Sequence, residues 1–174
     1  MKLFVFILIC VSLSAQVKAQ SLFKGSFTTQ NDPLNKTSEL IELKDSINNI
    51  VLSYSKRRFV YGGKVYLLTP YENKLAVIDS LSGARVGLMS KSLRSFSVGD
   101  FKYKLSKRGR AAYNFVVRSS KDDIISWVKY TQTKNRWEYK IVTNGDESLL
   151  PFVFLVAISE MKNIQALFWA SLLF

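Results

Sequence analysis

A ten-residue stretch near the C-terminus, Leu149 to Ile158, is apolar on every side and must be enclosed by something other than water. Pro151 suits the first turn of a helix, where the missing backbone N–H costs little, and Asp146 or Ser148 suits its cap. At about 1.5 Å per residue, such a helix covers roughly half of a bilayer core. We therefore predict a helix near 147–162 that is enclosed by protein, with membrane insertion as the alternative.

The part of the chain that would enclose this helix is a series of short segments rich in β-branched and aromatic residues. Turn formers separate the segments, and Gly62-Gly63 suits a tight hairpin because glycine tolerates a positive φ angle. The predicted strands are 50–55, 57–61, 64–69, 74–79, 84–90, 94–98, 101–106, 111–118, 124–130 and 136–143. Their close spacing is typical of a sandwich or barrel.

Apolar residues alternate with polar ones in several of these segments, which indicates one buried and one exposed face. Trp137, Tyr139 and Ile141 alternate with charged residues, so we expect them to be buried. The segment 101–106 alternates in the same way and places Phe101 on the expected buried face.

Other segments are less regular. Leu75 to Ile78 and Ile124 to Val128 are apolar on both faces, so we expect them to lie deeper. Ser21 to Thr29 favours an opening strand, residues 31–33 a turn, and residues 39–47 either another strand or a short helix.

The N-terminus has the three parts of an export signal. Lys2 supplies the positive charge, residues 3–13 are apolar, and small residues precede Gln20. The apolar run is too short to span a bilayer comfortably. We therefore predict a signal peptide over 1–19 and a single exported domain, periplasmic or secreted, over 20–174; an uncleaved membrane anchor is the alternative.

The chain contains no histidine, and its single cysteine, Cys10, lies in the predicted signal peptide. Histidine is the usual general base and a common zinc ligand. Histidine-dependent hydrolysis and His/Cys zinc sites are therefore excluded, and we predict no catalytic residue, no metal ligand and no cofactor. The alternative is an enzyme that works through lysine or carboxylates, and no spacing selects a pair among its candidates: Asp79, Asp100, Asp122, Asp123 and Glu138.

The chain is strongly basic, with 25 Lys and Arg against 13 Asp and Glu. Loss of Lys2 and Lys18 with the signal peptide would lower the net charge from +12 to +10. The candidate anion-binding residues are Lys56, Arg57, Arg58, Lys102, Lys104, Lys107, Arg108 and Arg110. Gathered at one barrel end, they would attract phospholipid headgroups, acidic polysaccharide or nucleic acid, the last being disfavoured by export. A solvated outer strand face is the alternative.

The segment Leu75-Ala76-Val77-Ile78-Asp79, followed by Gly83 and Val86, resembles a repeat of the tubby C-terminal-like superfamily. That superfamily includes tubby proteins, phospholipid scramblases and LURP-one-related proteins. Asp146-Glu147 before the apolar stretch resembles its acidic turn and barrel-filling helix. The resemblance covers residues 50–162, and it implies a mainly β fold with a closed antiparallel barrel of about 10–12 strands around a C-terminal hydrophobic helix. It also implies binding to anionic phospholipid.

Our prediction is therefore a non-enzymatic exported protein, with a binding or structural role, that associates with anionic lipid or another anionic envelope surface through a basic face. A carboxylate- or lysine-dependent enzyme and a membrane-anchored envelope protein are the alternatives. The apolar tail 163–174 stays unassigned, since it would cap the barrel, form a dimer or touch a membrane. The oligomeric state is also left open.

Overall fold

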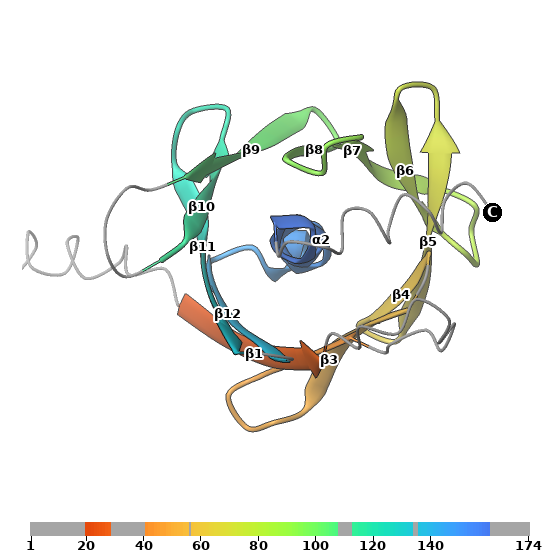
Figure 1. Ribbon diagram of the computed structural model, residues 1–174. Helices are drawn as coiled ribbons and strands as arrows, with labels where there is room; N and C mark the ends of the chain where they lie inside the picture. The colour runs from red at the N-terminus through yellow and green to blue at the C-terminus, as the bar shows by residue number, and fades with distance from the viewer. Residues whose placement is uncertain (1–19, 29–40, 56, 108–112, 134–135, 161–174) are drawn as a thin grey trace, which may run out of the picture.

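The structure is a computed structural model, and it describes residues 20–28, 41–55, 57–107, 113–133 and 136–160. Within these residues twelve antiparallel strands close into a barrel, and one α-helix lies inside it (Figure 1). Each strand pairs with its neighbours in the chain, and β1 pairs with β12 to complete the ring. The strands are β1 (Gln20–Thr28), β2 (Ile41–Lys44), β3 (Ile50–Ser55), β4 (Arg58–Tyr61), β5 (Lys64–Tyr71), β6 (Lys74–Asp79), β7 (Arg85–Ser90), β8 (Ser95–Val98), β9 (Phe101–Lys107), β10 (Phe115–Ser119), β11 (Ile124–Thr133) and β12 (Arg136–Asn144).

These elements confirm the predicted mainly β fold and the closed antiparallel barrel. The opening strand is confirmed as β1, and the described part of the segment 39–47, residues 41–47, contains the strand β2 and no helix. Residues 111–112 of the strand predicted over 111–118 lie outside the described residues; Tyr113 and Asn114 are not in a strand, and β10 begins at Phe115. Asn114 explains the late start, because its side-chain oxygen accepts a hydrogen bond from the backbone N–H of Tyr130 at 2.7 Å, replacing a regular strand bond. The turn expected at 31–33 lies outside the described residues.

The hairpin between β4 and β5 forms as predicted. Tyr61 pairs with Lys64, which leaves a two-residue loop, and the φ angles of Gly62 and Gly63 are 56° and 74°. Positive φ at both positions matches the right-handed twist of the flanking strands, which is why glycine is needed at this turn.

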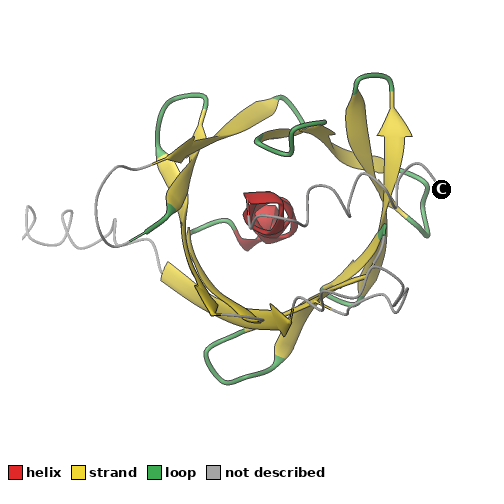
Figure 2. Cartoon of the chain, in the orientation of Figure 1, coloured by secondary structure: helices red, strands yellow, loops and turns green. Residues whose placement is uncertain are grey.

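The interior of the barrel is filled by the short 3-10 helix η1 (Glu147–Leu149) and the α-helix α2 (Leu150–Glu160). Every residue of α2 from Leu150 to Ser159 is buried. Figure 2 shows why no side of this helix is polar, since the ring of strands surrounds it on every side. The wall approaches the helix closely at Gly87, where a Cβ would lie 2.6 Å from the ring of Phe152.

Polar contacts hold the N-terminal end of this helical segment. The Asp146 carboxylate accepts a hydrogen bond from the backbone N–H of Ser148 at 2.9 Å, which confirms the cap on η1. The Tyr61 hydroxyl donates to the carbonyl oxygen of Glu147 at 2.8 Å, and the Ser21 hydroxyl donates to the Glu147 carboxylate. The segment is thereby tied to β4 and β1 before α2 begins.

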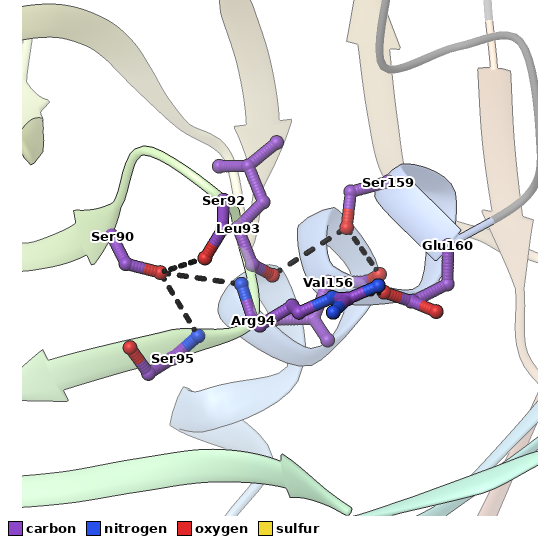
Figure 3. A network of polar contacts seen from close by, with 8 residues as sticks. All are labelled: Ser90, Ser92, Leu93, Arg94, Ser95, Val156, Ser159 and Glu160. Carbon is purple, nitrogen blue, oxygen red and sulfur yellow. Dashed lines mark hydrogen bonds and ion pairs between the residues drawn. The ribbon is translucent and has the colours of Figure 1, made fainter. Parts of the chain in front are cut away.

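The C-terminal end of α2 is held by the turn between β7 and β8 (Figure 3). Arg94 Nε lies 2.8 Å from Glu160 Oε1, and the Glu160 side chain is only 8% exposed. The Ser159 hydroxyl donates to the carbonyl oxygens of Val156 at 2.8 Å and Leu93 at 3.4 Å. Both ends of α2 are therefore attached to the barrel wall.

The core confirms the alternation of β12, because Trp137, Tyr139 and Ile141 are all buried. Phe101 was predicted on the buried face and this was wrong: it is 65% exposed, because it is the first residue of β9 after a turn. In the segment 75–78, residues 75–77 are buried on both faces as expected, whereas Ile78 is half-buried. The segment 124–128 is not, since only alternate residues in it are buried; one face of the wall meets the helix and the other meets solvent.

Candidate anion-binding face

The predicted anion-binding residues do not form one group in the part of the chain that the structure describes. Arg57 and Arg58 lie at the start of β4, whereas Lys102 and Lys104 lie on β9. Four strands separate β4 from β9 along the shorter way round the barrel, and Figure 1 shows them in different parts of the wall. Lys56, Arg108 and Arg110 lie outside the described residues, as does the side chain of Lys107. Anion binding by these residues stays a prediction.

A different set of basic residues does come together. Lys44 of β2, Lys24 of β1, Lys140 of β12 and Lys129 of β11 are consecutive partners across four neighbouring strands, and we call them the lysine row. Neighbouring strands are about 4.8 Å apart, so the row spans about 15 Å. Each lysine takes an outward position, because side chains alternate between the two faces of a strand and the residue before each lysine is buried: Phe23, Leu43, Val128 and Tyr139.

The charges of the lysine row are mostly uncompensated. Lys44 Nζ lies 3.7 Å from Glu42 Oε2. Lys24, Lys129 and Lys140 make no ion pair with any residue that the structure describes. Like charges placed directly opposite each other on adjacent strands destabilise a sheet. The row therefore costs stability and creates a positive potential that attracts anions.

A shallow depression of about 480 Å³, which we call the hollow, lies along the lysine row. The ladder between β1 and β2 has a single pair, Lys24 with Lys44, so the wall is open beside it. Tyr139 fills this opening from inside, and its hydroxyl donates to the carbonyl oxygen of Glu42 at 2.6 Å. Gly25 must be glycine here, because a Cβ would lie 2.2 Å from the Tyr139 hydroxyl oxygen.

The hollow remains positive although two carboxylates line it. Its basic residues are the lysine row and Arg136, and its acidic residues are Glu42 and Glu138. Arg136 Nε lies 3.5 Å from Glu138 Oε1, and a guanidinium N–H of Arg136 also donates to the Ser26 hydroxyl at 3.1 Å. Burial, followed by the nearby Glu42 charge, raises the pKa of Tyr139, so its hydroxyl stays protonated as a donor.

An apolar row lies beside the lysine row on the same face. Leu22, Val142 and Trp127 are partners across β1, β12 and β11, two residues along each strand from the lysines. All three are half-buried, and the ring of Trp127 packs 6.3 Å from that of Tyr113. This wall therefore carries a positive strip next to an apolar strip.

Sequence reasoning missed the lysine row because its members are single lysines in four separate strands. The alternation of β12 does place Lys140 on an outer face, and that is the only signal the sequence contained. The pairing of β1 with β12, which closes the barrel, brings Lys24 beside Lys140.

Asp79 and Asp122, two carboxylates of the enzyme alternative, lie in separate turns. The Asp79 carboxylate accepts hydrogen bonds from the backbone N–H groups of Leu81 at 2.9 Å and Ser82 at 3.1 Å. These bonds lower the pKa of Asp79 and shape the turn after β6. Asp122 pairs with Arg118 at 3.3 Å between β10 and β11. Both aspartates have structural contacts at turns.

The described residues contain no group of three or more His, Cys, Asp or Glu arranged to hold a metal ion. They also contain no helix with both the length and the apolar character needed to cross a bilayer.

Comparison with known proteins gave no match to a family model, to a curated protein or to a solved structure. The class of the protein therefore follows from its architecture, a closed barrel of twelve antiparallel strands with one C-terminal helix.

Proposed function

We propose that this protein is a non-enzymatic binding protein, exported to the periplasm or secreted, that attaches to anionic phospholipid or another anionic envelope surface through the lysine row. The observation that carries the proposal is the set of three neighbouring lysines, Lys24, Lys129 and Lys140, without an ion pair among the described residues. A bound anionic surface would relieve the repulsion between them.

We also propose kinship with the tubby C-terminal-like superfamily. The closed barrel around a C-terminal helix supports this, as does the turn between β6 and β7, where Asp79 accepts backbone hydrogen bonds and Gly83 has a φ angle of 68°. Kinship with that superfamily favours phospholipid over other anionic ligands.

The expected strength of the attraction follows from the number of lysines. A basic residue near an anionic membrane surface contributes about 1 kcal/mol, so four of them would increase binding roughly a thousandfold. The lysines face solvent, and salt screens exposed charges beyond about 10 Å at ordinary ionic strength. Binding should therefore weaken steadily as salt is added.

A vesicle-pelleting assay tests this proposal. The purified full-length chain should pellet with vesicles of equal parts phosphatidylglycerol and phosphatidylcholine, and much less with phosphatidylcholine alone. Replacing Lys24, Lys129 and Lys140 together by glutamine should weaken binding about a hundredfold, since each lysine contributes about 1 kcal/mol.

The matched control replaces three other exposed lysines, Lys64, Lys74 and Lys91, by glutamine, because they lie on or beside β5 to β8 and belong neither to the lysine row nor to the predicted anion-binding residues. This control should bind within about twofold of the unsubstituted chain at equal salt. An equal loss in both variants would mean that overall charge attracts the vesicles, and the assignment to the lysine row would be wrong.

A further inference from the structure

The turn between β2 and β3 exposes two isoleucines beside the lysine row. Ile47 is 75% exposed and Ile50 is 55% exposed. Ile50 is the direct partner of Lys44, so the two residues lie on the same face of the sheet. Figure 1 shows this turn, in orange, standing outside the ring of strands.

The turn is held in one shape by hydrogen bonds. The Asp45 carboxylate accepts from the backbone N–H groups of Ile47 at 3.0 Å and Asn49 at 2.9 Å. It also accepts from the side-chain amide of Asn49 at 3.1 Å. These bonds direct the Asp45 charge into the turn and hold Ile47 at its tip, so little conformational freedom remains to be lost on binding.

Leu81 and Phe101 are also exposed apolar residues, but they do not lie beside the lysine row. Leu81 is 97% exposed and Phe101 is 65% exposed, and each lies in or beside a turn away from the lysine row. Single apolar residues on a surface are normal and need no explanation. Ile50 differs because it is the cross-strand partner of Lys44, at one end of the lysine row, and Ile47 lies in the turn that joins these two residues.

A surface that presents lysines and projecting apolar side chains together matches a lipid bilayer. Anionic headgroups attract the lysines, and the acyl layer beneath them accepts the apolar side chains. A soluble polyanion offers no apolar layer for Ile47.

We infer that the β2–β3 turn inserts Ile47 and Ile50 into the acyl layer of an anionic bilayer while the lysine row contacts the headgroups. This inference rests on the proposed function and deepens it, because it specifies the partner as a bilayer and the attachment as partial insertion. Insertion is hydrophobic and is not screened by salt, so it leaves a salt-resistant part of the binding.

Substitution of the exposed isoleucines tests the inference by vesicle pelleting. Ile47→Ser and Ile50→Ser should each weaken binding to vesicles of equal parts phosphatidylglycerol and phosphatidylcholine about tenfold, since each removes the burial of an apolar side chain. Leu81→Ser is the matched control, because Leu81 is equally apolar and exposed but lies in another turn. It should bind as the unsubstituted chain does, and all three variants should keep its melting temperature.

A second measurement reports depth directly. In the Ile47→Trp variant, vesicles with brominated acyl chains should quench fluorescence more than they quench the unsubstituted chain, which contains three tryptophans. Equal quenching, or an Ile47→Ser variant that binds normally, would overturn the insertion.

The two proposals fail in different ways. If the lysine substitutions abolish binding while the isoleucine substitutions do not, the proposed function stands and the insertion is wrong. If the unsubstituted chain does not bind anionic vesicles, both proposals are wrong.

Discussion

The two faces of β12 differ in how their residues affect stability. On the inner face, Trp137, Tyr139 and Ile141 are at most 3% exposed and pack in the core around α2. On the outer face, Lys140 stands between Lys24 and Lys129 without an ion pair among the described residues. On the inner face, the apolar residues lie where burial stabilises the fold. On the outer face, three lysines lie opposite one another, and their repulsion lowers stability. Such local conflicts are expected at functional sites, which supports the proposal that the outer face carries the function.

The largest expected effect on stability comes from removing a large side chain from the core. Phe154 of α2 is fully buried, with its ring 5.9 Å from that of Tyr139. Phe154→Ala should lower the free energy of unfolding by about 3–5 kcal/mol, because it removes buried apolar area and leaves a cavity. Chemical denaturation measures this. Leu81→Ala, at a 97% exposed position, should change the same quantity by less than about 0.5 kcal/mol. Equal effects would mean that the barrel does not enclose α2.

A smaller effect on the free energy of unfolding is expected from the Tyr139 hydroxyl, which reaches from the core to the β2 backbone. Tyr139→Phe keeps the ring and removes the hydroxyl that donates to the Glu42 carbonyl oxygen at 2.6 Å. The free energy of unfolding should fall by about 1 kcal/mol, which is the usual net value of such a bond. Tyr71→Phe is the control, because Tyr71 is exposed and its hydroxyl makes no hydrogen bond within the described residues. No difference between the two variants would show that the Tyr139 hydroxyl does not close the wall.

The charge of Asp79 is stabilised by hydrogen bonds, unlike the charges of Lys24, Lys129 and Lys140 in the lysine row. Its pKa is lowered in the folded protein, chiefly by the backbone N–H groups of Ser82 and Leu81. The stability from this charge is therefore present above the ordinary aspartate pKa of about 4, and it is lost as the pH falls through the lowered value. Asp79→Asn keeps an acceptor oxygen but cannot titrate.

The unsubstituted chain should therefore lose more stability than the Asp79→Asn variant between neutral and strongly acidic pH. Thermal melting as a function of pH measures this difference. Asp100→Asn is the control, since its side chain accepts no hydrogen bond within the described residues. Parallel pH profiles for the unsubstituted chain and Asp79→Asn would contradict the role of this charge.

The smallest expected effect has the opposite sign. Lys140→Gln removes the repulsion with Lys24 and Lys129, so the free energy of unfolding should rise by roughly a few tenths of a kcal/mol at low salt. The same variant should bind anionic vesicles more weakly. The gain in stability should shrink as salt screens the charges. Lys102→Gln, whose cross-strand partner is Ser97, should show no such gain, and a loss of stability in Lys140→Gln would contradict the repulsion.

The strands and the helix were predictable because their signals are local. The turn at Gly62-Gly63 and the alternation of Trp137, Tyr139 and Ile141 each depend on a few consecutive residues. The prediction was wrong where a side chain replaced a backbone bond, as at Asn114, and where a strand end lay open to solvent, as at Phe101.

The candidate site was not predictable in the same way. Arg57 and Arg58 drew attention because they are adjacent in the sequence, yet Lys102 and Lys104 lie elsewhere in the wall. The members of the lysine row are isolated in the sequence, and only the pairing of their strands makes them neighbours.

By itself, the sequence determined that a wholly apolar helix would have to be enclosed, and that a series of strands was present to enclose it. The tertiary structure alone decided which outward residues became neighbours. The physical reason is that side-chain direction follows from a period of two within each strand, whereas register depends on pairing between strands far apart in the chain. Closure of β1 on β12 therefore placed Lys24 beside Lys140, and the bulge between β2 and β3 placed Ile50 beside Lys44.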